Sequence, residues 1–192
     1  IVVIACHFAE RNRLCTTTIE RLEAARQFYQ QCALRLAEGY RYLFVVTGDV
    51  PYESGSPTLC VLMHDYLIAQ GISPDDVLTA TGGTGSFMEP PLVIGLLRER
   101  YPGLKRLAVV SSNWQLWAGR PFWRRAAEPA GLSLRFISLS GTGGWRTRCT
   151  YAGYALLIRI ALASGLWPWL ERILSARVYE PRRQGFRING CA

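Results

Sequence analysis

Chemistry-bearing side chains in this sequence follow directly on stretches that have the composition of buried strands. The clearest case is Arg106–Arg125, where the apolar run 107–110 is followed at once by Ser111, Ser112 and Asn113, and then by a helix rich in tryptophan and arginine. A strand, a hydroxyl-rich turn and a helix are how open α/β sheets build ligand sites at the carboxyl ends of their strands. The stretch therefore predicts a pocket, although it identifies neither the ligand nor the reaction.

The other expected strand ends carry side chains of the same kind. Hydroxyl groups and helix N-termini supply donors for phosphate or carboxylate, and glycines let the backbone approach a ligand closely. Ordinary turn and capping roles are the alternative for each of them, since Ser, Thr, Asp and Gly are what turns require. The candidate ligand-binding residues at these ends are Thr47, Gly48, Asp49, Gly83, Thr84, Gly85, Ser86, Ser111, Ser112, Asn113 and Gln115.

Two residues are the candidates for acid–base catalysis. His7 follows the first strand, where an imidazole is useful as a general acid or base, and Glu89 lies at the start of a helix after the third strand. A structural histidine and a capping glutamate are the alternatives. Asp49 and Glu89 could also converge as a metal or acid–base pair, but two carboxylates of unknown separation are weak evidence, and we expect no metal site. His64 lies within a helix and is interpreted as structural or surface-exposed.

The glycine-rich turns match no established nucleotide or hydrolase motif. The segments 81–86 and 140–144, TGGTGS and SGTGG, fit neither the dinucleotide-binding fingerprint nor the P-loop pattern. There is no GxSxG elbow of the kind that carries an α/β-hydrolase nucleophile. None of the six cysteines has CxxC spacing, which argues against a zinc ribbon or a thioredoxin-like site.

Short apolar runs alternate with segments of helical periodicity along the whole chain, which predicts an α/β protein with a mostly parallel sheet. We expect a Rossmann-like three-layer sandwich of five strands, in one domain spanning residues 1–192, with a core up to 140 followed by an apolar helix and a basic tail. Thr17 or Thr18 is expected to cap the first helix. The expected strands are Ile1–Cys6, Tyr42–Val46, Asp76–Thr79, Leu107–Val110 and Leu134–Ile137, and the helices are Ile19–Ala37, Leu59–Gln70, Phe87–Tyr101, Gln115–Ala130 and Tyr151–Leu174.

The composition favours a folded, basic protein. Hydrophobic residues make up 49% of the 192 residues, which argues against disorder, and the net charge is +8. A solvated, arginine-rich surface is the simplest reading of that charge, and an anionic ligand or a membrane surface is the alternative. No nucleic-acid recognition motif accompanies the charge, so we expect no nucleic-acid partner.

Residues 151–170, near the end of the chain, are almost entirely apolar. Their single charged residue is Arg159, with tyrosines at one end and Trp167 and Trp169 at the other. A helix buried against the sheet is the favoured interpretation. A membrane span is disfavoured by the central arginine, and a helix that docks a partner or lies on a membrane surface is the remaining alternative.

Five segments carry a family resemblance. TTTIERLEAARQFY places an arginine, Arg21, before an apolar helical stripe, and VVTGD ends a strand in Thr-Gly. SPTLCVLMHDYLIAQGIS follows as a helix, and SFMEP places Ser86 and Glu89 at the start of the next one. VVSSNWQLWAGR places two serines at a strand end. In this order, over residues 1–137, the chain resembles the YdcF/SanA/ElyC-like family, a bacterial domain of unknown function.

The resemblance implies a function that the residues alone do not give. It implies a small anionic or nucleotide-like ligand, with S-adenosylmethionine as the suggested cofactor, hydrolysis or group transfer as the reaction class, and Arg21 as a source of charge. Gln115 stands where the family has a histidine, and glutamine cannot transfer protons as histidine does. A non-catalytic ligand-binding protein and an envelope-associated interaction protein are therefore the alternatives. A bacterial cytoplasmic location is expected over an envelope-associated one, and the oligomeric state is left open.

Overall fold

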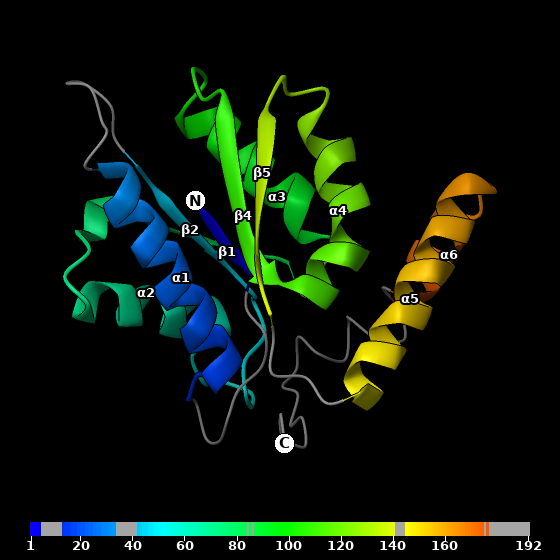
Figure 1. Ribbon diagram of the computed structural model, residues 1–192, viewed down its shortest axis with the longest axis horizontal. Coiled ribbons are helices and arrows are strands. Elements are labelled where there is room, and N and C mark those ends of the chain that lie inside the picture. The colour runs from blue at the N-terminus through cyan, green and yellow to red at the C-terminus, as the bar shows by residue number, and fades with distance from the viewer. Residues whose placement is uncertain are drawn as a thin grey trace.

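A five-stranded, all-parallel sheet forms the centre of the computed structural model, which describes residues 1–4, 13–33, 42–83, 85, 87–140, 145–174 and 176 (Figure 1). The strand order is β3-β2-β1-β4-β5, which matches the first five strands of the doubly wound nucleotide-binding order. The predicted α/β, Rossmann-like architecture is thereby confirmed. The strands are β1 (Val2–Ile4), β2 (Phe44–Thr47), β3 (Val77–Ala80), β4 (Arg106–Ser112) and β5 (Ser133–Leu139).

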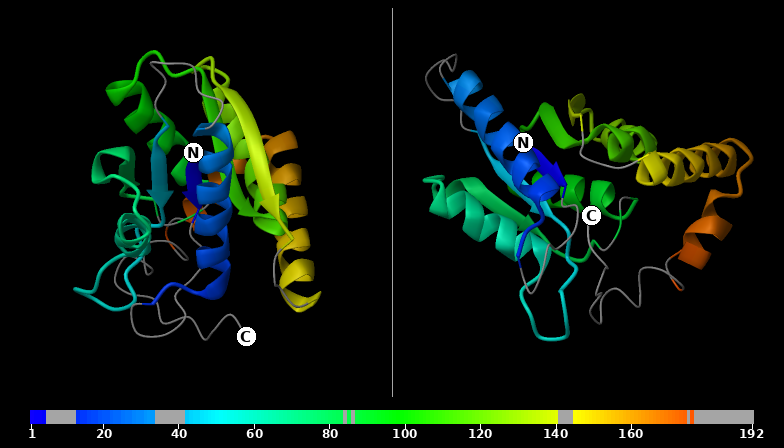
Figure 2. Two further views of the ribbon diagram at one scale, coloured as in Figure 1. Left: turned by 60° about the vertical axis from the view of Figure 1, so that its left-hand side comes forward. Right: turned by 60° about the horizontal axis from the view of Figure 1, so that its bottom comes forward.

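Helices cover both faces of this sheet. α1 (Thr16–Ala33) and α2 (Leu59–Ala69) lie on one face, and α3 (Glu89–Arg100) and α4 (Asn113–Ala127) lie on the other (Figures 1 and 2). A single 3-10 turn, Pro74–Asp76, leads into β3. Because both faces are covered, successive strand residues are buried on opposite sides: Val3 belongs to the core under α1 and α2, and Val2 to the core under α3 and α4. This explains why the strands are continuous apolar runs.

Two of the predicted boundaries are corrected by the structure. α1 begins at Thr16, where the Ile19 amide donates to the Cys15 carbonyl, so Thr17 and Thr18 lie within the first turn and the predicted cap at those positions is wrong. β4 extends through Ser111 and Ser112, which pair with β5, and α4 follows without an intervening turn. The two serines are therefore held by strand hydrogen bonds rather than by a loop.

The predicted helix over 151–174 is also wrong, because two helices occupy this region. α5 (Trp145–Ala163) ends before Gly165, whose φ of 73° is a left-handed conformation that favours glycine, and α6 (Trp167–Leu174) begins directly afterwards. The Ser164 hydroxyl donates to the Ile160 carbonyl at the end of α5, which satisfies a backbone acceptor there. The chain reverses at this corner instead of continuing as one long apolar rod (Figure 2).

α5 packs against α4 rather than against the sheet, so the predicted burial on the sheet is wrong. Ala155 and Ile158 of α5 join Phe122 of α4 in a third apolar cluster. Trp167 of α6 closes that cluster, with its ring centroid 4.6 Å from that of Phe122 and 5.3 Å from that of Phe87. The two helices form an outer layer beyond α4 (Figure 1). Among the helices that the structure describes, none is sufficiently long and apolar to cross a bilayer.

Candidate functional site

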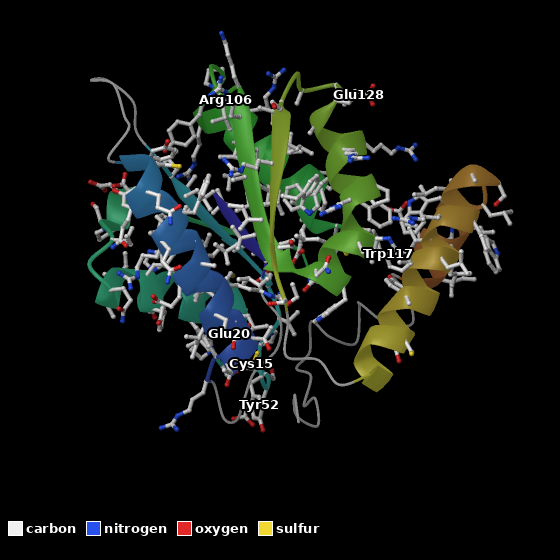
Figure 3. The ribbon with its side chains drawn as sticks, in the orientation of Figure 1. Cys15, Glu20, Tyr52, Arg106, Trp117 and Glu128 are labelled. Carbon is white, nitrogen blue, oxygen red and sulfur yellow. The ribbon has the colours of Figure 1, made fainter. Side chains whose placement is uncertain are left out.

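The carboxyl ends of β1 and β4 are the place where the topology predicts a ligand site. The chain builds β1, β2 and β3 outward in one direction and then returns to place β4 on the other side of β1. The connections on the two sides of this point lie on opposite faces, and doubly wound sheets commonly bind their ligands beyond the strand ends at such a point. Figure 3 shows this edge, with Cys15 and Tyr52 near it and Arg106, at the amino end of β4, far from it.

Arg21 spans the ends of β1 and β4 from the α1 side. Its side chain is fully buried, Nη1 donates to the Ile4 carbonyl at 2.9 Å, and Nη2 and Nε donate to Ser112 Oγ at 2.8 and 3.2 Å. Its guanidinium carbon also lies 5.6 Å from the ring centroid of Trp114. Arg21 belongs to the inner stripe of α1, as do Thr18 and Ala25 at the neighbouring turns. A permanent positive charge is thus fixed at the topological switch point, the place between β1 and β4 where the order of the strands reverses.

Glu89 reaches the same place from the opposite face of the sheet. It is the first residue of α3, its side chain is 6% exposed, and its Oε2 has no hydrogen-bond partner among the described residues. Burial raises the pKa of Glu89 to about 7, although a hydrogen bond from Thr47 and the charge of Arg21 oppose that increase. A carboxyl group with this pKa can both donate and accept a proton near neutral pH.

Gly83, in the turn beside Glu89, leaves little room for a side chain. A Cβ on Gly83 would lie 3.2 Å from Glu89 Cγ and 3.3 Å from Leu92 Cδ1. The Asp49 carboxylate accepts the Gly82 amide at 2.7 Å, and the Asp49 amide donates to the Gly83 carbonyl at 2.9 Å. Asp49 therefore ties the loop after β2 to the turn after β3, which is the structural alternative for this residue.

The two serines at the end of β4 point to opposite faces of the sheet, as the strand periodicity requires. Ser112 faces α1 and accepts from Arg21, whereas Ser111 donates to the Gln115 side-chain oxygen at 3.2 Å. Both serines are fully buried. Ser112 precedes the first residue of α4 without making a side-chain capping bond. The first amides of α4 therefore need partners other than this hydroxyl, and an anion is one that helix N-termini commonly bind.

We call Arg21, Thr47, Glu89, Ser111 and Ser112 the switch-point cluster. Thr47, the last residue of β2, is 1% exposed and pairs in register with Ile4, so its hydroxyl lies beside the end of β1. Below a pH of about 7 the Glu89 carboxyl is mostly neutral while Arg21 remains charged, which leaves the pair with a net positive charge. Buried positive charge of this kind favours an anionic ligand.

Other predicted site residues have different surroundings. Asn113 is exposed as the first residue of α4. The Gly48 carbonyl accepts the Cys60 amide, and the Gly85 carbonyl accepts the amides of Met88 and Glu89 at the start of α3. His64 is half-buried on α2 and hydrogen-bonds Asp65, in agreement with the structural or surface interpretation. The predicted residues His7, Thr84 and Ser86 lie outside the described residues.

Two contributors to the cluster were absent from the sequence prediction. The Ile4 carbonyl accepts from Arg21, and the Trp114 ring lies against the same guanidinium. A backbone acceptor leaves no signal in a sequence, and Trp114 is one of six tryptophans, so neither could be singled out. Only the strand order that brings β1 beside β4 identifies them.

The described residues form no metal centre at the cluster. Within the part of the chain that the structure describes, no three His, Cys, Asp or Glu side chains group in a way that could hold a metal ion. A cavity of about 140 Å³ lies beside the edge strand β3 and shares no residue with the switch-point cluster. It is lined by His64, Val77, Leu78, Thr79, Leu96 and Arg100.

Comparison with known proteins identifies no relative of this chain. The chain matches no family model, no curated protein and no solved structure. The geometry of the switch-point cluster is therefore the basis on which a function can be proposed.

Proposed function

We propose that this protein binds a small anionic or nucleotide-like ligand at the carboxyl edge of its sheet and uses Glu89 as a general acid or base in a hydrolysis or group-transfer reaction. The observation that carries this proposal is the buried Glu89 carboxyl, with Oε2 unpaired among the described residues, beside the buried guanidinium of Arg21. Burying both groups is costly for folding, and such a cost is typical of functional sites.

The strand-end geometry supports the anionic ligand class. Arg21 fixes a positive charge between the ends of β1 and β4, and α4 begins at the same edge with the amides of its first turn. Phosphate and carboxylate groups suit such a combination of donors. S-adenosylmethionine, which carries a carboxylate, is the candidate cofactor that the family resemblance adds.

Glu89 supports the reaction class. With a pKa of about 7, its carboxyl group exists in both protonation states at neutral pH, as acid–base catalysis requires. The neutral form donates a proton to a leaving oxygen, and the ionised form accepts one from a water or hydroxyl nucleophile. Gln115 cannot share this proton transfer, because an amide side chain does not titrate near neutral pH. Its oxygen instead accepts a hydrogen bond from the Ser111 hydroxyl.

Ligand binding in the presence of cluster variants tests the site. The purified protein is screened by thermal shift with nucleotides, sugar phosphates, pyrophosphate and S-adenosylmethionine, and each stabilising compound is titrated by calorimetry. We expect Ser112→Ala to weaken binding about tenfold or more, because Arg21 loses the acceptor that orients it. The matched control Asp65→Asn changes an exposed carboxylate on α2 and should leave the affinity unchanged.

The pH dependence of binding tests the role of Glu89. Wild-type affinity for an anion should fall as the pH rises through about 7, because ionised Glu89 then cancels the charge of Arg21. Glu89→Gln, titrated with the same ligand, should lose that part of the dependence. If no compound binds, or if a bound compound is insensitive to both cluster variants, the proposed site is wrong.

Binding without catalysis is the second candidate function, favoured by the hydrogen bond that engages Gln115 with Ser111. The two functions differ in the fate of the ligand. Turnover that is lost in Glu89→Gln supports the enzyme, whereas unchanged ligand recovered after long incubation supports a sensor or carrier.

A further inference from the structure

The outward surface of α5 and α6 holds large apolar side chains in water. We define the α5–α6 face as Leu156, Leu157, Ile160, Leu166 and Trp169, whose side chains are between 49% and 61% exposed. Leu156, Leu157 and Ile160 follow helical spacing and so lie on one side of α5. Leu166 lies at the corner before α6, and Trp169 is exposed on α6, whereas Trp167 and Leu170 of the same helix are buried. Such a cluster on a surface marks an interaction site more often than a solvated one.

α5 is apolar on both of its sides, which distinguishes it from an ordinary surface helix. Its inner stripe, with Ala155, Ile158 and Ala161, is buried against α4 and α6, and its outer side carries the α5–α6 face. A helix that only covers a globular core has a charged outer side. The outward apolar residues of α5 are therefore not required by its packing in the described structure.

The distribution of charge identifies the chemistry of the partner. The helices α5 and α6 together contain four arginines and one glutamate, a net charge of +3. Arg159 and Arg172, on α5 and α6, are exposed beside the apolar face. The guanidinium of Arg159 lies 4.6 Å from the ring centroid of Trp117, which Figure 3 shows on α4 toward α5. Apolar side chains flanked by arginines fit a negatively charged lipid surface.

We propose that α5 and α6 dock this protein on the surface of an anionic lipid bilayer. Leu156, Ile160 and Trp169 enter the boundary between headgroups and acyl chains, and the arginines bind the phosphates around them. The docking is interfacial, because no described helix is long and apolar enough to cross the bilayer. Packing of Trp167 against Phe122 holds the face outward, so docking requires no rearrangement of the sheet.

A second copy of this chain is a poorer occupant of the same face. In a symmetric dimer formed through α5 and α6, the net charge of +3 on these helices in one copy would lie against the same charge in the other. Like charges placed together disfavour association, whereas anionic lipids are attracted by them.

Vesicle co-sedimentation of the full chain tests the proposal. Vesicles of phosphatidylglycerol mixed with phosphatidylcholine are compared with vesicles of phosphatidylcholine alone, at low and high salt. The wild-type protein should pellet with the anionic vesicles at low salt and much less with the neutral ones. Ile160→Glu and Trp169→Ala should each reduce the partition coefficient about tenfold or more, because each removes apolar surface from the interface.

Val61→Glu is the matched control. Val61 is a large apolar residue that is 39% exposed. It lies on α2, at the opposite face of the sheet from α4 and α5, so its change should leave vesicle binding intact. Circular dichroism establishes that each variant is folded. The proposal is overturned if the wild-type protein does not bind anionic vesicles, or if Ile160→Glu and Trp169→Ala bind them as well as wild type does. It is also overturned if light scattering shows a dimer that these variants dissociate and the wild type binds no vesicles.

Discussion

The carboxyl edge of the sheet buries a guanidinium and a carboxyl group, whereas the α5–α6 face exposes five large apolar side chains to water. The first arrangement costs desolvation of charge, and the second leaves apolar area unburied. Both depart from the distribution that folding alone favours, and in opposite directions. Function is expected where a protein departs from the arrangement that favours folding. We therefore propose a ligand site at the carboxyl edge and a lipid-binding surface on α5 and α6.

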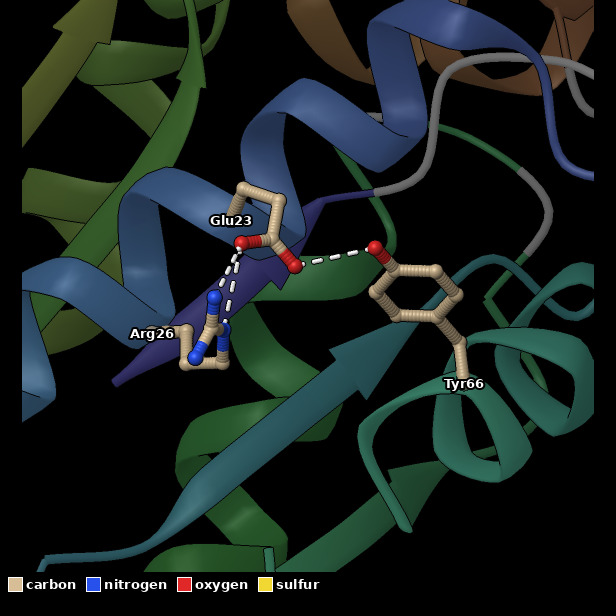
Figure 4. A network of polar contacts seen from close by, with 3 residues as sticks. All are labelled: Glu23, Arg26 and Tyr66. Carbon is tan, nitrogen blue, oxygen red and sulfur yellow. Dashed lines mark hydrogen bonds and ion pairs between the residues drawn. The ribbon is translucent and has the colours of Figure 1, made fainter. Parts of the chain in front are cut away.

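A half-buried ion pair on α1 shows how unusual the fully buried arginine is. Glu23 accepts from Arg26 Nη2 at 2.7 Å and from the Tyr66 hydroxyl at 2.9 Å, linking α1 to α2 (Figure 4). The hydrogen bond from Arg26 holds the pKa of Glu23 below its usual value. Arg26 is half-buried and pairs with one local carboxylate. Arg21, one and a half turns earlier on the same helix, is instead fully buried and bonded to the ends of two strands.

Removal of the buried guanidinium should have the largest effect on stability. Arg21→Ala leaves the Ile4 carbonyl and Ser112 Oγ without their donors and opens a cavity, so we expect a loss of about 3–5 kcal/mol in the free energy of unfolding. Arg26→Ala, five residues away at a half-buried position with one local partner, should change it much less. Urea unfolding of both variants gives the comparison. Equal effects would show that burial does not distinguish the two arginines.

Neutralising the buried carboxyl should stabilise the protein at alkaline pH. The Glu89 pKa is raised from 4.5 to about 7 on folding, so the folded state binds this proton more tightly and loses stability as the pH rises between those values. Glu89→Gln removes that loss and should gain about 3 kcal/mol relative to wild type at pH 8, with little gain near pH 4. Urea unfolding across this range measures it. A constant difference at every pH would contradict a raised pKa.

The two serines at the end of β4 should differ in their contributions to stability. Ser112→Ala removes the acceptor of two guanidinium N–H groups and should cost about 2 kcal/mol, whereas Ser111→Ala removes one neutral hydrogen bond and should cost about 1 kcal/mol. Thermal and urea unfolding of the two variants provide the test. A larger effect at Ser111 would mean that its hydrogen bond to Gln115 stabilises this edge of the sheet more than the hydrogen bonds between Arg21 and Ser112 do.

The α5–α6 face should contribute least to folding. Ile160→Ala on the exposed side of α5 is expected to alter the free energy of unfolding by no more than about 0.5 kcal/mol. Ile158→Ala makes the same change two residues away, on the buried side, and should cost about 2–5 kcal/mol. A substantial loss in Ile160→Ala would mean that the face is covered within the protein itself.

Local pattern was sufficient to predict most of the fold. Strands buried on both faces are continuous β-branched runs, and helices on a sheet repeat their apolar residues at helical spacing, so each element could be recognised from its own residues. The boundaries shifted where a neighbour decided them. β4 extends to Ser112 because β5 supplies ladder partners as far as Leu139, and no property of Ser111 or Ser112 alone predicts that pairing.

The candidate site was predicted in composition but not in contacts. Thr47, Ser111, Ser112 and Glu89 were expected at strand ends and helix starts, and parallel strands bring such ends to one edge. Arg21 lies 91 residues from Ser112, its hydrogen-bonding partner. Arg21 was identified only through a family resemblance, because an arginine within a helix looks the same whether it faces solvent or a strand end.

The sequence by itself determined the alternation of strands and helices, the polar character of the strand ends and the apolar character of the last segments. Only the tertiary structure decided that Arg21 and Glu89 meet from opposite faces of the sheet, and that α5 covers α4 while its other side faces water. The physical reason is that periodicity reports which side chains prefer burial, whereas strand order and helix packing decide which of them are buried. For α5, both sides prefer burial, and its neighbours α4 and α6 cover only one of them.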